Sequence, residues 1–218
     1  MDKLLLPFKS GNLVILGKRG SGKSTLAVAA GAFRRSGLLV DTLGDLPFGR
    51  PVTFAGLAGF GDKWRRLNMP AEAVSLHVGI DVLAGGSFAA VLKLAKADIL
   101  PNPFTLLVDE VDAYGSAAYN NVALRELARY GRHWGVAYIV TARRYAEIPK
   151  DWTSGADLIL MGPSLDPQDA AMVERIIGGA YMAIWRNLRP YNFFGISLDG
   201  PAIYVYDSVE RSIQARSL

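Results

Sequence analysis

Glycine, basic and hydroxyl side chains are combined in the segment GKRGSGKS at residues 17–24, between an apolar run and a helix-like run. The segment matches the complete pattern GxxxxGK[ST], in the strand-to-helix context that a phosphate-binding loop requires. Its glycines allow a tight turn in which successive backbone N–H groups point inward, and the positive end of the following helix faces the same place. The segment therefore predicts a site for the phosphates of a nucleotide.

Individual residues of this loop have separate expected roles. Lys23 is expected to reach the β- and γ-phosphates, and Ser24 to hold Mg²⁺ through its hydroxyl. Thr25 is the second choice for the metal because the pattern ends at Ser24. The residues expected to contact ATP in and beside the loop are Gly17, Lys18, Arg19, Gly20, Ser21, Gly22, Lys23, Ser24 and Thr25.

Two adjacent carboxylates end a second apolar run, FTLLVDE, at residues 104–110. Asp109, at the tip of the predicted strand, can bind the same Mg²⁺ through water or through Ser24 and so neutralise phosphate charge. Glu110 points elsewhere and can orient and deprotonate an attacking water as a general base. Together with the loop, the pair predicts ATP hydrolysis. Asp112 is either a further orienting acid or a loop residue, and we favour the loop.

A third apolar run, residues 136–141, ends at Thr141. If this strand neighbours the strand that ends at Asp109, the Thr141 hydroxyl lies beside the γ-phosphate. Thr141 is then a candidate sensor of that phosphate, and the alternative is an ordinary threonine at a strand end.

The elements that must position these residues can be read from apolar runs bounded by Gly, Pro or charge. We expect strands at residues 13–16, 38–41, 52–54, 73–78, 104–108, 136–141 and 157–161. We expect helices at residues 23–35, 88–97, 122–130 and 167–177, with Asn121, Gly131 and Gly178 as caps. Continuously apolar strands that alternate with helices indicate a buried, parallel sheet covered on both faces, so the expected fold class is α/β with three layers.

The C-terminal part follows another pattern. Residues 191–197 and 202–206 resemble two strands joined by the turn-forming sequence LDGP, so we expect a β-hairpin that extends the sheet. Residues 43–61, rich in Gly and Pro, are the best candidate for an irregular insertion. A chain of 218 residues without a separating linker is expected to form a single domain, residues 1–218.

Composition excludes several function classes. The chain has no cysteine, which rules out disulfides, thiolate metal sites and thiol catalysis. No apolar run approaches the roughly 18 residues needed to span a bilayer, so we expect no membrane span and a cytoplasmic protein. The formal net charge is +4, and the basic residues occur in clusters that a polyanion could use, although a solvated face also explains each cluster.

Four further segments occur in order: RHWG, VAYIVTARR, IPKD and ADLIL. This succession resembles the FtsK/HerA superfamily of P-loop ATPases, over most of residues 11–177. The resemblance implies a P-loop NTPase fold of the ASCE type and an activity that pumps double-stranded DNA. In these families a glutamine usually follows the sensor-strand threonine, whereas this chain has Ala142, which leaves Thr141 or Arg143 to take the sensor role.

The chain is compact for this superfamily, and in that respect it resembles the genome-packaging ATPases of tailless icosahedral viruses with an internal membrane. The resemblance implies a homo-oligomeric ring, a hexamer or pentamer, that threads DNA of any sequence into a preformed capsid and contacts capsid vertex proteins. An arginine from a neighbouring subunit would complete each site. Arg175 is the first candidate for it, and Arg143 and Arg144 are the alternatives. Lys63, Arg65 and Arg66 are candidate contacts to DNA phosphates.

Three alternatives remain open. A plasmid or cellular relative would act in DNA transfer or processing, and gene neighbourhood would distinguish it. A small nucleotide kinase shares the size and the loop, but it usually lacks the Asp-Glu pair and needs an arginine-rich lid, for which the sequence gives no clear candidate. In a nucleotide-gated binding module, turnover would be incidental. Stimulation of ATP hydrolysis by DNA of any sequence separates the motor from the last two.

Overall fold

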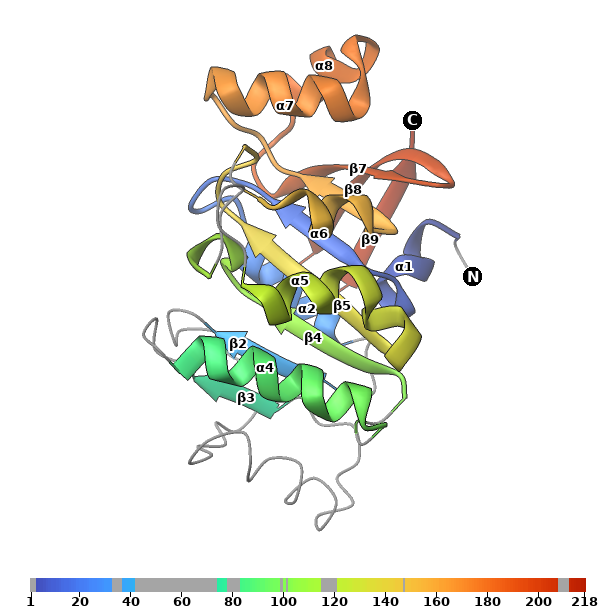
Figure 1. The fold of residues 1–218 in the computed structure, drawn as a ribbon. Helices are drawn as coiled ribbons and strands as arrows, with labels where there is room; N and C mark the ends of the chain where they lie inside the picture. The colour runs from blue at the N-terminus through green and yellow to red at the C-terminus, as the bar shows by residue number, and fades with distance from the viewer. Residues whose placement is uncertain are drawn as a thin grey trace.

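In the computed structural model of the chain, residues 3–32, 37–41, 74–77, 83–98, 100, 102–114, 121–146, 148–207 and 212–218 are described. They form a nine-stranded sheet with the order β3-β2-β4-β5-β1-β6-β7-β8-β9 (Figure 1). The strands are β1 (Leu13–Leu16), β2 (Gly37–Asp41), β3 (Val74–His77), β4 (Phe104–Val108), β5 (Val136–Ala142), β6 (Leu158–Met161), β7 (Asn192–Ser197), β8 (Gly200–Asp207) and β9 (Ser212–Ser217). The expected α/β class with a mostly parallel sheet is confirmed.

Six parallel strands, from β3 to β6 in this order, make up the part of the sheet that carries the predicted site. Strand β5 lies between β1 and β4, with Val140 paired to both Val14 and Val108. The condition placed on Thr141 is therefore met, because its strand is the direct neighbour of the strand that ends before Asp109. All of β1 and β4 is buried, which explains why these strands are continuously apolar in the sequence.

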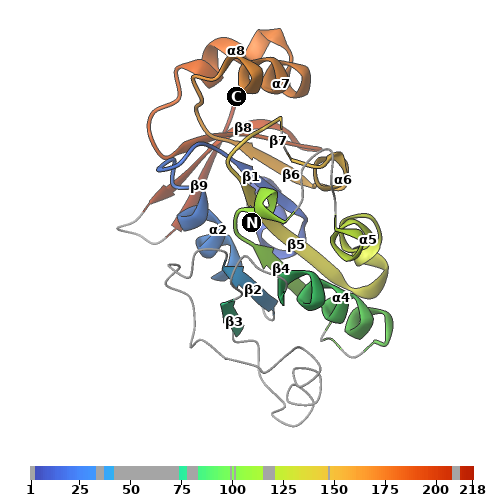
Figure 2. The same ribbon diagram turned by 60° about the vertical axis from the view of Figure 1, so that its left-hand side comes forward.

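Helices cover both faces of the sheet (Figures 1 and 2). They are α1 (Leu6–Ser10), α2 (Lys23–Ala32), α4 (Leu83–Lys96), α5 (Val122–Tyr130), α6 (Lys150–Ser154), α7 (Pro167–Ile177) and α8 (Gly179–Arg186), with 3-10 turns η1 (Lys3–Leu5), η2 (Val111–Ala113) and η3 (Gly131–Trp134). Successive residues of β1 face opposite sides: Ile15 packs in the core beneath α2, and Leu16 in the core beneath α5 and α6. This alternation gives the three layers.

Local signals gave several element bounds directly. The expected bounds of β1, β4, α5 and α7 are those observed. Asn121 caps α5 by accepting hydrogen bonds from the backbone N–H groups of Ala123 and Leu124, and Gly131 and Gly178 follow α5 and α7 as C-caps. Helix α4 begins at Leu83, earlier than expected. The expected strand at 52–54 and the candidate insertion at 43–61 lie outside the described residues.

The C-terminal hairpin is confirmed as β7 and β8, which are antiparallel to each other and continue the sheet from β6. Strand β8 begins at Gly200, so the expected turn is shorter than LDGP. A third antiparallel strand, β9, was not predicted; only Ile213 of it is buried, so it lacks the apolar run used to find strands. Helices α7 and α8 pack against each other at the top in Figure 1. None of the described helices combines the length and apolarity that crossing a bilayer requires.

Candidate active site

The loop from Gly17 to Gly22 connects β1 to α2 at the carboxyl edge of the parallel strands. Gly20 and Gly22 have φ values of 78° and 86°, in the left-handed region that favours glycine. The N–H of Gly17 donates to the carbonyl of Ala142 at 3.1 Å, so the first residue of the loop is held by the end of β5. Lys23 and Ser24 form the first turn of α2. The sequence thus folds locally into the expected phosphate-binding turn.

The base of this loop rests on aromatic donors that the sequence analysis missed. The Tyr145 hydroxyl lies within hydrogen-bond reach of the carbonyls of Leu16, at 3.2 Å, and of Gly162, and shares its one proton between them. The indole N–H of Trp185 donates to the same Gly162 carbonyl at 3.0 Å, and the N–H of Gly162 donates to Leu16 at 2.8 Å. Both aromatic side chains are fully buried. No local pattern signals these contacts, because they join β1, the end of β6 and α8.

Ser24, Asp109 and Thr141 form one hydrogen-bonded group. Oγ of Ser24 donates to Oδ1 of Asp109 at 2.9 Å, and Oγ1 of Thr141 donates to the same oxygen at 2.7 Å. Asp109 and Thr141 are buried, with 2% and 0% of their surfaces exposed. The expected pairing of Ser24 with Asp109 across the two motifs is therefore present in the structure.

The electrostatic state of Asp109 suits a cation ligand. Burial raises its pKa above the ordinary value, and hydrogen bonds from Thr141 and Ser24 and the positive charge of Lys23 oppose that rise in pKa. A divalent cation beside the carboxylate would stabilise its ionised form. The described residues contain no cluster of three or more side chains that could hold a metal alone. Ser24 and Asp109, which are hydrogen-bonded to each other, could contribute two ligands to a Mg²⁺ ion that phosphate oxygens also bind.

Glu110 is turned away from Asp109 by its backbone. Its φ and ψ are 54° and 56°, a left-handed conformation that is uncommon for a residue other than glycine. Its N–H donates to Oγ1 of Thr141 at 2.8 Å, which holds this conformation in place. Its carboxylate Oε1 lies 3.6 Å from Nζ of Lys23, and both side chains are less than a tenth exposed. The general-base candidate thus faces the phosphate loop.

Arg143 lies between two carboxylates. Its Nε is 3.6 Å from Oε1 of Glu110 and 3.6 Å from Oδ2 of Asp112, and half of its side chain is exposed. The side chain of Asp112 is only 4% exposed, and its Oδ1 has no hydrogen-bond partner in the described part of the chain. Asp112, which we favoured as a plain loop residue over an orienting acid, lies in the short 3-10 turn η2, and its buried carboxylate faces Arg143.

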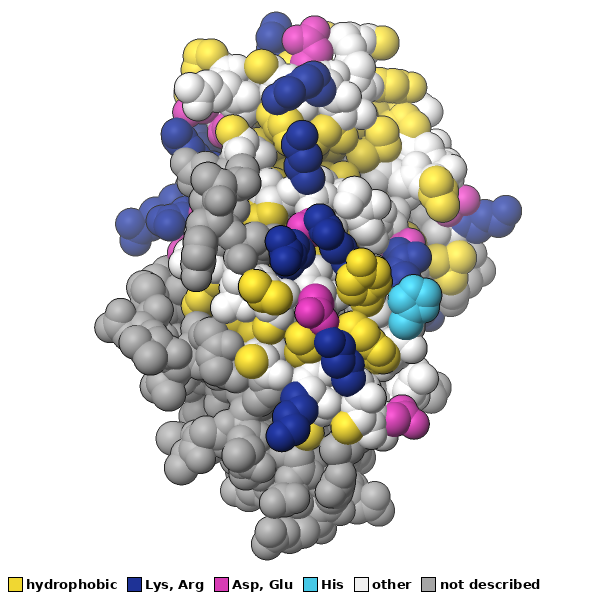
Figure 3. Space-filling view, viewed as in Figure 1, with side chains coloured by type: hydrophobic (Ala, Val, Ile, Leu, Met, Phe, Trp, Pro, Cys, Tyr) yellow, Lys and Arg dark blue, Asp and Glu magenta, His cyan; other side chains and the backbone are white. Residues whose placement is uncertain are grey.

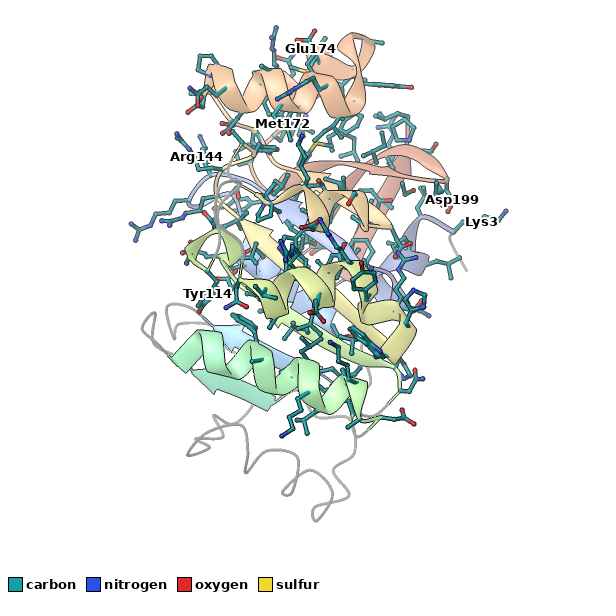
Figure 4. All side chains as sticks on the ribbon, viewed as in Figure 1. Lys3, Tyr114, Arg144, Met172, Glu174 and Asp199 are labelled. Carbon is teal, nitrogen blue, oxygen red and sulfur yellow. The ribbon has the colours of Figure 1, made fainter. Side chains whose placement is uncertain are left out.

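The other predicted arginines lie elsewhere. Nη1 of Arg144 contacts Oδ2 of Asp166 at 3.0 Å, next to the start of α7 (Figure 4). The next residue, Tyr145, donates its N–H to Oδ1 of Asp169 in the first turn of α7 at 3.1 Å. Arg175 is exposed on α7 and contacts Sδ of Met172 on its own helix. Lys63, Arg65 and Arg66 lie outside the described residues.

The loop fits a phosphate ligand on an observation independent of its sequence pattern. Oγ of Ser21 is buried and has no hydrogen-bond partner among the described residues, which is costly unless a ligand or water accepts from it. Lys18, Arg19 and Gly20 are exposed at the tip of the loop, and Thr25 is exposed on α2. A triphosphate would supply acceptors for Ser21, for Lys23 and for the loop N–H groups together.

No family model matches the sequence, and neither does any curated protein. The fold matches the genome packaging NTPase B204 from Sulfolobus turreted icosahedral virus 2, solved with ATP-γS, with a TM-score of 0.67 and 19% identity over 96% of this chain and 97% of that one. B204 from Sulfolobus turreted icosahedral virus, described as a DNA-packaging ATPase, matches with a TM-score of 0.62 and 18% identity over 95% and 97%.

A bacterial ATPase has a similar fold. The structure of ATPases 2 and 3 of EssC from Geobacillus thermodenitrificans matches with a TM-score of 0.55 and 17% identity, over 90% of this chain and 39% of that one. These likenesses agree with the resemblance seen in the motifs. The chain shares its fold with these packaging and EssC ATPases.

Proposed function

We propose that this chain is an ATP hydrolase whose turnover drives double-stranded DNA, most specifically a viral genome, into a preformed capsid. The observation that carries the hydrolase is the convergence of Lys23, Ser24, Asp109 and Glu110 at one edge of the sheet, with the contacts given above. Two of these residues come from the phosphate loop and two from the end of β4. In this proposal residues 1–218 form one ATPase domain.

The residues suggest a division of work during hydrolysis. The phosphates enter the loop, and Lys23 exchanges its contact with Glu110 for the β- and γ-phosphate oxygens. Ser24 and Asp109 would hold Mg²⁺, whose charge would neutralise part of the phosphate charge. The released Glu110 accepts a proton from a water as the water oxygen attacks the γ-phosphorus, and the bond to the bridging oxygen breaks to leave ADP and phosphate.

Thr141 and Arg143 then take different roles. The Thr141 hydroxyl donates to Asp109 and accepts from the N–H of Glu110, so both of its strong interactions serve the two acids. We infer that Thr141 positions these carboxylates. Arg143 is half exposed, and its Nε lies 3.6 Å from each of two carboxylates, so it is the better candidate for contact with the γ-phosphate.

The coupling to DNA rests on likeness and on surface charge. The B204 structures are those of a genome packaging enzyme, and this chain spans nearly their whole length. Figure 3 shows Lys and Arg side chains spread over the face that α4, α5, α6 and α7 form. Exposed basic residues of α4, α5 and α6 are Lys93, Lys96, Arg125, Arg129 and Lys150. Contacts of this kind to DNA phosphates are independent of sequence, as a packaging motor requires.

A ring of identical subunits, a hexamer or pentamer, completes the proposal. Arg175 is exposed on α7 and is therefore accessible to the site of a neighbouring subunit, where it would stabilise charge on the transferred phosphoryl group. Capsid vertex proteins would be the partners of this ring in the host cytoplasm. A plasmid or cellular DNA-transfer ATPase is the second candidate, and the likeness to EssC shows that a similar fold also occurs in a cellular ATPase.

The test is ATP hydrolysis by the purified protein with Mg²⁺, with and without two double-stranded DNAs of unrelated sequence. The Glu110→Gln protein, whose side chain keeps its size but cannot accept the proton, is the matched control. We expect stimulation by both DNAs, and we expect Glu110→Gln to bind ATP with little turnover. Turnover indifferent to DNA would favour a kinase-like enzyme, no turnover would favour a nucleotide-gated module, and parental turnover by Glu110→Gln would contradict the assignment of the base.

A further inference from the structure

Tyr191 is held in a conformation that tyrosine rarely adopts. It directly precedes β7, its φ is 64°, and 60% of its surface is exposed. A bulky residue in the left-handed region is an outlier, and such outliers gather at ligand sites. The N–H of Asn192 donates to the carbonyl of Arg189 at 3.1 Å, which closes the turn around Tyr191. The turn thus presents a large apolar ring to the outside.

The ring lies against the phosphate loop. Strand β7 runs antiparallel to β6, so its first residue lies at the carboxyl edge of the parallel strands, where the loop also lies. A Cβ built on Gly22 would be 2.8 Å from Cδ1 of Tyr191, and 3.7 and 3.8 Å from the next two ring atoms. Any side chain at position 22 would therefore collide with the ring, in addition to the strain of φ 86°.

The chemistry of this place is that of a nucleobase contact. Phosphates held in the loop leave the ribose and base of a nucleotide outside it, at its rim. Exposed aromatic rings offer bases a stacking surface that is tolerant of base identity, because every base has a π-face. Of the two exposed tyrosines in the described residues, Tyr130 is at the end of α5, and Tyr191 is the one in contact with the loop.

We propose that the Tyr191 ring is the platform for the nucleoside part of the bound nucleotide. This inference rests on the proposed binding of ATP at the loop and adds the group that recognises the base end of the ligand. The ring, and not the phenolic hydroxyl, makes the contact. Tyr191 is a binding residue in this proposal and takes no part in the chemical step.

The test compares two ligands that differ only in the nucleoside: MgATP and magnesium tripolyphosphate, titrated calorimetrically into the full chain. The variant Tyr191→Asn removes the ring but keeps a residue that tolerates a positive φ, and Tyr191→Phe keeps the ring. Tyr130→Ala is the control for loss of an exposed tyrosine elsewhere. We expect Tyr191→Asn to weaken MgATP about tenfold, which corresponds to about 1.4 kcal/mol, and to leave tripolyphosphate unchanged. Tyr191→Phe and Tyr130→Ala should bind both ligands as the parent does.

Three results would overturn the inference. Equal weakening of both ligands by Tyr191→Asn would mean that the ring only supports the shape of the loop. Unchanged binding of both would mean that the ring is not part of the site. Weakening of MgATP by Tyr191→Phe to the same degree would assign the contact to the hydroxyl. A parent protein that binds neither ligand would instead refute the proposed nucleotide site itself, which keeps the two failures distinguishable.

Discussion

The two ends of the central strands carry similar polar side chains, which differ in whether they have hydrogen-bond partners. At the carboxyl end, Ser21 Oγ and Asp112 Oδ1 are buried without a hydrogen-bond partner among the described residues, Asp109 has a raised pKa, and Glu110 has a left-handed backbone. Figure 4 labels Tyr114 and Arg144 toward this side and Asp199 toward the other. Buried polar groups at the carboxyl end therefore lack hydrogen-bond partners among the described residues. Such groups are expected at a ligand site, where the ligand supplies the partner, and are costly in a purely structural region.

At the amino end the polar groups around Asn12 are paired, while the indole N–H of Trp152, whose ring packs on Tyr138, has no hydrogen-bond partner among the described residues. Buried Asn12 donates its N–H to Asp157 at 2.6 Å and its amide to the Gly155 carbonyl at 3.0 Å, and it accepts from the N–H of Tyr138 at 3.1 Å. Arg132 contacts Asp157 at 2.7 Å. A surface cavity of about 460 Å³ lies here, lined in part by these residues. Asn12, Arg132 and Asp157 in its lining already have hydrogen-bond partners in the protein, in contrast to Ser21 and Asp112 at the carboxyl end.

Replacing Lys23 should cause the largest loss of turnover. Lys23→Ala removes the cation that faces both the phosphates and Glu110, and we expect turnover to fall at least about 100-fold, as for loss of one preorganised charge partner of a transition state. The measurement is kcat at saturating MgATP. Arg132→Ala, which removes a cation at the amino end, is the matched control and should keep the parental kcat. Parental turnover by Lys23→Ala would remove the loop from the chemistry.

Replacing Arg143 should sharpen the assignment of the sensor. Arg143→Ala is expected to lower kcat about 10- to 100-fold with little change in the affinity for ADP, because the side chain is proposed to contact only the γ-phosphate. Titration of ADP and of a non-hydrolysable ATP analogue gives the two affinities. Arg216→Ala, which removes an exposed arginine on β9, is the control. Equal losses of both affinities in Arg143→Ala would indicate a general role in holding the loop.

At the amino end the expected effect is on stability. Asn12→Ala leaves the N–H of Tyr138 without its buried acceptor and removes one of the two donors to the Gly155 carbonyl, which keeps its bond from Arg132. This should cost about 2–3 kcal/mol of unfolding free energy. For a chain of this size that corresponds to a fall in Tm of about 4–12 °C. Thermal unfolding measures the shift, and kcat per folded molecule should stay unchanged. A large loss of kcat at unchanged Tm would mean that this end also serves the reaction.

Replacing Asp109 should have the smallest effect, which is a change in how stability depends on pH. Its native pKa is raised above the ordinary 3.8, so the native state binds this proton more tightly than the unfolded chain does. The contribution of Asp109 to unfolding free energy therefore falls as pH rises above 3.8 through the native pKa. Asp109→Asn should raise the Tm of the ligand-free protein at neutral pH. This gain in Tm should shrink as the pH is lowered toward the ordinary pKa of 3.8. A gain that is independent of pH would place its cause outside this titration.

Local signals account for what the sequence predicted well. The GxxxxGK[ST] pattern and the apolar run of β4 located the loop and the acid pair, because these motifs are contiguous in the chain. Asn121 and Gly178 set helix ends through contacts within a few residues. Other contacts join elements far apart in sequence, so no sequence spacing predicts them. These are the contacts of Tyr145 and Trp185 with Gly162 and of Asp112 with Arg143. Strand β9 is absent from the predictions because its burial is too slight for a periodic signal.

The bonds of Arg144 to Asp166 and of Tyr145 to Asp169 have a mechanical consequence. The stretch that carries Arg143 is fastened at two successive residues to the first turn of α7, whose far end carries Arg175. A displacement of the backbone at Arg143 must either be shared by the start of α7 or break these bonds. The position of this stretch of backbone is therefore tied to that of a helix on the outer surface.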